Sequence, residues 1–93
     1  MLTIRYRKSF KKDYKKAQKS HQPMDELWAV IEKLQKEEPL DWKYRDHLLT
    51  NYEGRNDVRD CHIRPDFVLV YSIQDDVLIL ELLRLGSHSE VLQ

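Results

Sequence analysis

Residues 77–85 limit what this chain can fold into more than any other segment, because they are apolar on both faces of an extended strand. The apolar residues at odd positions are Val77, Ile79 and Leu83, and those at even positions, on the other face, are Leu78, Leu80 and Leu82. Strands of this kind are buried on both faces, so we predict that this one lies inside a sheet. Further strands are predicted at 57–63 and 67–73, and the polar residues 74–76 join the last two strands into a hairpin.

The first forty residues predict one strand and two helices. Leu2, Ile4 and Tyr6 alternate with polar residues, which is typical of a short strand. Ser9 is the expected N-cap of a helix that runs to about residue 20. A second helix starts near residue 24 and stops shortly before Pro39.

The chain is therefore expected to be one α+β domain, 1–93, with the order βααβββ. Its N-terminal strand and helical hairpin pack on a small, mainly antiparallel twisted sheet. Residues 40–56 show no clear period and are rich in aromatic side chains, so we expect an ordered loop of functional importance. Pro65 is expected at a bend or edge between two strands, and residues 87–93 are expected to form a short polar tail.

Size and composition exclude several classes of protein. Ninety-three residues, 41% of them hydrophobic and 34% charged, are enough for one thin core. No run approaches the roughly 20 apolar residues of a membrane helix, and the N-terminus lacks the apolar stretch of a signal peptide. A lone Cys61 cannot form an internal disulfide, so we expect a cytoplasmic protein.

The charges are sorted along the chain although their sum is zero. Residues 1–20 hold eight Lys and Arg against one acid, Asp13. Such a patch attracts phosphate or an acidic protein segment, whereas the simpler alternative is a solvated helix face. The helix lysines concerned are Lys11, Lys12, Lys15, Lys16 and Lys19.

Three of the four histidines lie outside the predicted helices, next to acids and arginines. His62 shares its strand face with Asp60, while His88 and Asp66 lie at strand ends, so these side chains and His47 from the loop can converge. Two imidazoles and a carboxylate suit RNA cleavage, in which the ribose 2′-OH attacks the adjacent phosphate. For any single histidine, a surface or structural role is the competing interpretation.

Neither a metal nor another cofactor is expected. Histidine, Cys61 and aspartate side chains can bind metals, but the chain has no CxxC, HxxxH or C-x-x-H spacing. It also has no glycine-rich phosphate loop, since Gly54 and Gly86 are its only glycines.

Three ordered blocks resemble the YafQ-like branch of the RelE/ParE toxin superfamily. These blocks are Asp46-His47-x-Leu49, then Arg59-Asp60-x-His62-Ile63-x-Pro65-Asp66-Phe67-x-Leu69-x-Tyr71, and finally Leu83-x-Leu85-Gly86-Ser87-His88-Ser89. The resemblance covers nearly the whole chain in order. It implies a RelE-like fold and the toxin of a type II toxin–antitoxin pair. Members of this branch are ribosome-dependent endoribonucleases that cut mRNA, and a cognate antitoxin inhibits them.

The resemblance also assigns catalytic roles by position. His88 is then the general acid, and His47 contacts the scissile phosphate. Asp66, alone or with His62, is the base or orients it, and the pattern leaves this choice open. Phe67 takes the position of an aromatic ring that stacks on a base.

Binding roles follow from the same resemblance. Arg59 and Arg84 either contact phosphate or pair with a nearby acid, and Tyr71 is expected in the core. The lysine helix is expected to dock on ribosomal RNA or to receive an acidic antitoxin segment. Val91 and Leu92 replace an aromatic residue that some relatives carry after the last histidine, so stacking by the tail is not expected here.

Two alternative functions need no nuclease activity. One is a ParE-like binding module that acts on a protein target such as DNA gyrase. The other is a small nucleic-acid-binding regulator that uses the basic helix, although this helix has few residues suited to read base edges.

Overall fold

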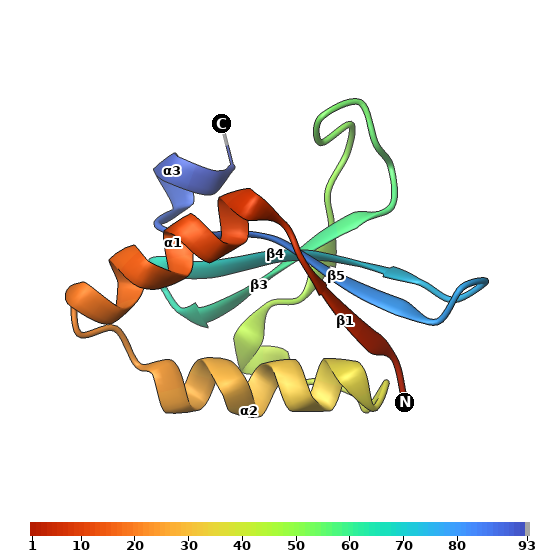
Figure 1. The fold of residues 1–93 in the computed structure, drawn as a ribbon, viewed down its shortest axis with the longest axis horizontal. Helices are drawn as coiled ribbons and strands as arrows, with labels where there is room; N and C mark the ends of the chain where they lie inside the picture. Colours follow the sequence, from red (N-terminus) through yellow and green to blue (C-terminus); the bar gives the residue numbers. More distant parts are fainter. Residues whose placement is uncertain (93) are drawn as a thin grey trace.

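A five-stranded sheet with two helices on one face forms the centre of the molecule (Figure 1), and the computed structural model describes residues 1–92. The strand order is β1-β5-β4-β3-β2. The strands are β1 (Thr3–Tyr6), β2 (His47–Leu48), β3 (Val58–Arg64), β4 (Phe67–Gln74) and β5 (Ile79–Gly86). The helices are α1 (Lys8–Lys19), α2 (Met24–Gln35), α3 (His88–Val91) and the short 3₁₀ helix η1 (Trp42–Tyr44). The predicted α+β class is confirmed, as is the interior position of the doubly apolar strand, β5.

Strand β5 lies between β1 and β4. It pairs in parallel with β1, where Thr3 faces Ile79, and antiparallel with β4, where Leu69 faces Leu85. One face of the sheet packs under α1 and α2, so Leu80 and Leu82 join Phe10 in the main core. The predicted hairpin and the turn at Pro65 are confirmed, and the register of β3 shifts between His62 and Arg64.

The start of α1 differs from the prediction. The helix begins at Lys8, and its N-cap is Arg7, which offers no side-chain hydrogen bond. Ser9 lies inside the first turn, where its hydroxyl donates to the Leu83 carbonyl at 2.7 Å. A sequence motif for a cap cannot show that a tertiary acceptor competes for the same hydroxyl.

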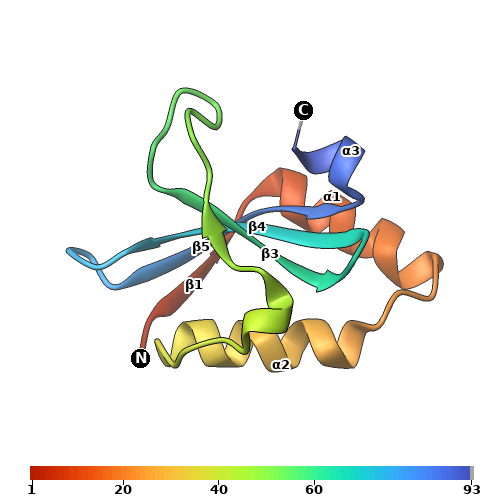
Figure 2. The ribbon, with the colours of Figure 1, turned by 180° about the vertical axis from the view of Figure 1, so that it is seen from behind.

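The segment 40–56 is more regular than a loop. It contains η1 and then β2, which adds to the edge of β3 with His47 opposite Asp60. A two-residue strand has no periodicity that a sequence pattern can detect. Tyr52, further along, donates its hydroxyl to the Val91 carbonyl at 2.8 Å, which links this segment to α3. Figure 2 shows the green segment after β2 and the helix α3 both extending away from α2.

The predicted polar tail is wrong for residues 88–91, which form α3; residue 93 lies outside the described part. Ser87 and Glu90 make a reciprocal capping box, and Val91 is buried against the second face of the sheet. This short helix therefore covers apolar surface and fixes where His88 lies. No helix within residues 1–92 has the length and apolar character needed to cross a membrane.

Replacing Ser87 with alanine is expected to destabilise the fold modestly. The change removes the capping bond to the Glu90 backbone N–H, which is worth about 1 kcal/mol in free energy of unfolding. Urea denaturation measures the loss, with Ser20→Ala as the control, because the Ser20 side chain is exposed and makes no hydrogen bond within residues 1–92. Equal losses in the two variants would contradict the role given to the cap.

Candidate active site

Three histidines from three different elements form a row on one edge of the molecule. His47 comes from β2, His62 from β3 and His88 from the first residue of α3. The ring centroids of His47 and His62 are 6.5 Å apart, and those of His62 and His88 are 6.2 Å apart. The structure thus brings together the three histidines that the sequence selected, with His62 in the middle.

Asp60 lies behind this row and is completely buried. Its Oδ1 is 2.8 Å from Nδ1 of His47, and its Oδ2 is 3.7 Å from Nε2 of His62. Neither contact has hydrogen-bond geometry, and neither oxygen has another partner within residues 1–92. Such a carboxylate is stabilised by charge on the two rings rather than by hydrogen bonds.

Burial raises the pKa of Asp60, and positive charge on His47 or His62 counteracts that effect. The sequence placed Asp60 on the same strand face as His62 but assigned it no role. The available signal was an acid between Val58 and His62 on one face of a strand. Asp60 is therefore the main addition that the structure makes to the candidate site.

Backbone carbonyls fix the tautomers of two histidines. Nδ1 of His47 lies 3.0 Å from the Arg45 carbonyl oxygen, and Nδ1 of His62 lies 3.3 Å from that of Pro65. A carbonyl only accepts, so each Nδ1 carries a hydrogen and donates it. In the neutral rings, Nε2 is then the nitrogen that can take up a proton.

Asp66 holds His88 in place. One of its carboxylate oxygens accepts the backbone N–H of His88 at 2.8 Å. The contact joins the turn between β3 and β4 to the start of α3, and it fixes the backbone from which the His88 side chain extends. This geometry favours an orienting role for Asp66 over that of the base.

Arg59 and Arg84 both pair with acids of the chain itself. Arg59 lies 3.2 Å from Asp46, which also accepts the Tyr71 hydroxyl, and Arg84 lies 2.7 Å from Asp13. Of their two predicted roles, structural pairing is the one that the structure shows. Tyr71 is in the core, as predicted.

The expectation that Phe67 stacks on a base is corrected. Its ring is 2% exposed and belongs to the main core, so it has no free face to offer. An apolar ring at the first position of a strand fits both a stacking and a core role, and the sequence alone did not separate them.

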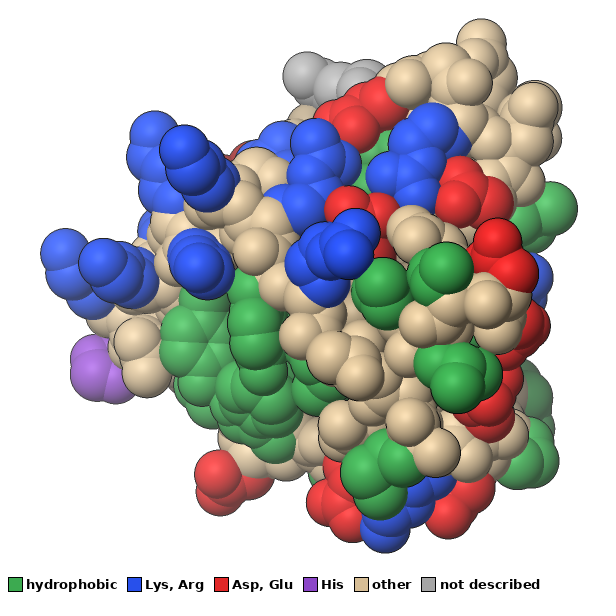
Figure 3. All heavy atoms as spheres, turned by 45° about the vertical axis from the view of Figure 1, so that its right-hand side comes forward, with side chains coloured by type: hydrophobic (Ala, Val, Ile, Leu, Met, Phe, Trp, Pro, Cys, Tyr) green, Lys and Arg blue, Asp and Glu red, His purple; other side chains and the backbone are tan. Residues whose placement is uncertain are grey.

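The predicted lysine face is exposed along α1. Figure 3 shows Lys and Arg side chains gathered where this helix runs. Lys11, Lys12, Lys15 and Lys19 point to solvent, whereas Lys16 forms an ion pair with Glu90 of the capping box. One member of the lysine face thus contacts the helix that carries His88.

Comparisons with known proteins agree with this fold. A family model described as "Bacterial toxin of type II toxin-antitoxin system, YafQ" matches residues 2–93. A relative from Escherichia coli B/BL21-DE3, named mRNA interferase toxin YafQ, is 38% identical over 88 residues, which cover 92% of this chain and 90% of the relative.

Solved structures give the same result. A metal-bound toxin from Helicobacter pylori has a TM-score of 0.90 and 45% identity, covering 98% of this chain and 99% of that one. The toxin in the E. coli DinJ–YafQ complex has a TM-score of 0.86 and 33% identity over the whole of both chains. The fold and the sequence define a bacterial toxin of the type II class. Within that class, the chain belongs to the YafQ family.

The metal-bound relative makes the donor set of this chain relevant. Within residues 1–92, no group of three or more His, Cys, Asp and Glu side chains is arranged to hold a metal ion. Cys61, the residue with the greatest affinity for soft metals, is buried on the opposite face of β3 from His62.

Proposed function

We propose that this toxin is an endoribonuclease that cleaves mRNA on the ribosome with its own histidines. The row His47, His62 and His88 over the buried Asp60 is the observation that supports this proposal most directly. The relatives named mRNA interferases share its length and fold. A binding module for a protein target has no use for such a set of acids and bases.

The proposed reaction needs no nucleophile from the protein and no metal. The ribose 2′-oxygen forms a bond to phosphorus, the bond from phosphorus to the 5′-oxygen breaks, and the products are a 2′,3′-cyclic phosphate and a 5′-hydroxyl. One group takes the proton of the 2′-OH, and another gives a proton to the leaving 5′-oxygen. A cation next to the phosphate stabilises the charge that develops there.

The geometry supports one assignment of roles. His62 is the base, because it lies in the middle of the row and Asp66 is occupied by the His88 backbone. His88 is the acid, as the resemblance implies, and its side chain is exposed at one end of the row. His47 donates to the phosphate oxygens when protonated, and the carboxylate of Asp60 stabilises that charge.

The lysine face is proposed to dock on ribosomal RNA. Ribosomal RNA presents dense phosphate, and the lysines of α1 supply charge without base contacts. The same face also suits an acidic segment of a cognate antitoxin, the second proposed partner. The E. coli relative of this toxin, YafQ, has been solved in a complex with DinJ.

Reversing two of these lysines is expected to weaken ribosome association about tenfold at low salt, with a smaller loss at high salt. The double variant is Lys12→Glu with Lys15→Glu. Its control is Lys33→Glu with Lys36→Glu, the same charge change on α2 and the residue that ends it. Sedimentation with ribosomes measures both, and equal affinity of the test variant and wild type would refute this docking surface.

Arrest of protein synthesis tests the proposal against the gyrase alternative. On expression of the toxin in cells, incorporation of labelled amino acid should fall while DNA synthesis continues. If DNA synthesis falls first and mRNA stays intact, the result would support a ParE-like action on a protein target.

A further inference from the structure

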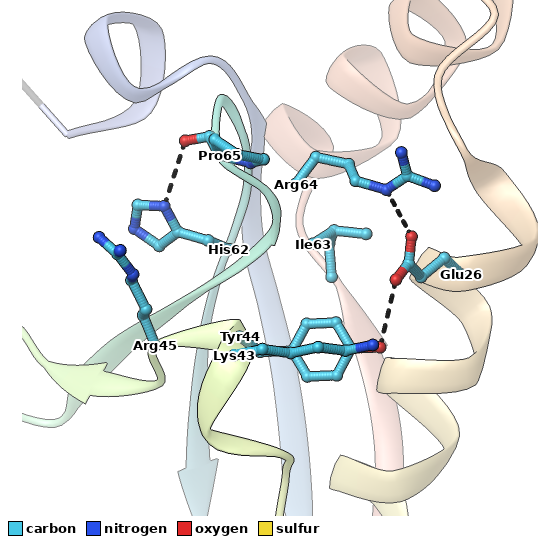
Figure 4. Close-up of a pocket in the computed structure, with 8 residues that line it drawn as sticks. All are labelled: Glu26, Lys43, Tyr44, Arg45, His62, Ile63, Arg64 and Pro65. Carbon is cyan, nitrogen blue, oxygen red and sulfur yellow. Dashed lines mark hydrogen bonds and ion pairs between the residues drawn. The ribbon is translucent and has the colours of Figure 1, made fainter.

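A cavity of about 440 Å³ lies beside the row of histidines and has no role in the reaction described so far (Figure 4). Its wall is shared by the end of β3, the segment around η1 and the first turn of α2. His62 belongs both to this wall and to the row, so the cavity opens next to the proposed base.

Three cations line the cavity, and only one of them is balanced there. Nε of Arg64 donates to the Glu26 carboxylate at 2.6 Å, and that carboxylate also accepts the Tyr44 hydroxyl at 3.2 Å (Figure 4). The Arg64 contact holds the pKa of Glu26 below its ordinary value, so Glu26 is charged at neutral pH. Lys43 and Arg45 remain, and the cavity carries two net positive charges.

Arg45 is the best placed of these cations to meet a phosphate. Its side chain is exposed, extends on the His62 side of the cavity in Figure 4 and makes no hydrogen bond to another side chain that lines the cavity. Its backbone is fixed by its own left-handed conformation at the end of η1, with φ 50°, and by the bond from His47 to its carbonyl oxygen. The Arg45 side chain is therefore attached to the backbone that positions a histidine of the row.

Apolar and aromatic surface completes the cavity. Ile63 and Pro65 line it with the ring of Tyr44, over which the Lys43 ammonium lies 5.2 Å from the centroid. A volume of this size matches those of small-molecule sites in proteins, which are about 300–1,000 Å³. Apolar surface next to cations suits a base with its phosphate.

We infer that this cavity is a nucleotide subsite, which holds the nucleotide of the RNA strand next to the scissile phosphate. Arg45 contacts its phosphate, Lys43 adds positive charge to the cavity, and the base packs against the exposed Pro65 and the half-buried Tyr44. The inference rests on the proposed function, because an RNA strand must cross the row of histidines. A strand in this position lies along the η1 side of His62, so the cavity helps to set the sequence preference of cleavage.

The test uses a short RNA whose ribose at the cleavage position lacks the 2′-OH, so that it binds without being cut. In a titration to millimolar concentration, wild-type protein should show NMR shifts at Tyr44, Ile63 and Arg64. Arg45→Gln should weaken binding about tenfold, the effect of one lost charge-assisted contact. Arg5→Gln is the matched control, because Arg5 lies on β1 at the opposite edge of the sheet.

The outcomes separate the two proposals. Shifts confined to α1, or equal affinities of Arg45→Gln and Arg5→Gln, would overturn the subsite whether or not the wild type cuts mRNA. Binding that depends on Arg45, in a protein that leaves mRNA on ribosomes intact, would support nucleotide binding in the cavity and refute the nuclease activity.

Discussion

Replacement of His88 by alanine is expected to slow mRNA cleavage on ribosomes by about a hundredfold to ten-thousandfold, the usual contribution of a general acid. Fold and stability should change little, because the His88 side chain is exposed and its backbone N–H remains to bind Asp66. Single-turnover cleavage measures the rate. His21→Asn is the control, since His21 is exposed in the turn after α1 and asparagine tolerates its left-handed backbone.

A substrate with sulfur in place of the leaving 5′-oxygen identifies the acid. A thiolate leaves without being protonated, so His88→Ala should cut this substrate nearly as fast as wild type does. A variant that is equally slow on both substrates would show that His88 binds or orders the RNA and does not donate the proton.

Replacement of Asp60 by asparagine is expected to lower activity while leaving the fold at least as stable. The neutral amide no longer attracts the protonated rings of His47 and His62. A loss of about a thousandfold corresponds to the roughly 4 kcal/mol of attraction between charges at such a separation in a partly buried site. Asp60 does not reach the RNA in this arrangement, so we describe it as a positioning residue.

The stability of the same variant has a predictable dependence on pH. The pKa of Asp60 is raised in the folded state, so wild type loses stability as pH rises from the unfolded value near 3.8 through the folded pKa. The amide of the Asp60→Asn variant has no proton to lose in this range. The difference in free energy of unfolding, variant minus wild type, should therefore increase with pH across this window.

Urea denaturation between pH 4 and pH 8 measures this difference, with the exposed Asp76→Asn as control. An Asp60→Asn protein that loses both activity and stability at neutral pH would indicate a purely structural carboxylate. A shift in the acid limb of the pH–rate profile would confirm that Asp60 acts through the histidines.

The sequence predicted the parts of the fold that depend on long periodic patterns. Apolar spacing located both helices of the hairpin, and the doubly apolar run placed β5 inside the sheet. The parts that it missed are short or depend on distant partners. Strand β2 has two residues, and α3 is a single turn whose capping box, Ser87 to Glu90, is a signal that the tail prediction overlooked.

The candidate site, too, was predicted only where sequence patterns mark its residues. The three histidines were selected because they lie in the resembling blocks and outside the predicted helices, and the structure brings them together. Asp60 was not selected because its role depends on burial, which a residue-by-residue pattern does not report. Phe67 was misassigned for the same reason, since its ring is in the core. The place of Arg45 in the cavity wall was missed, because Arg45 lies in a turn that no sequence motif marks.

Primer-extension mapping of mRNA on ribosomes, with purified wild type and His88→Ala side by side, tests whether this toxin cleaves mRNA with His88 as the acid. Wild type should cut within the decoding site and leave 2′,3′-cyclic phosphate and 5′-hydroxyl ends, and the variant should make no cut over the same time. Intact mRNA with both folded proteins, or equal cutting by both, would contradict this mechanism.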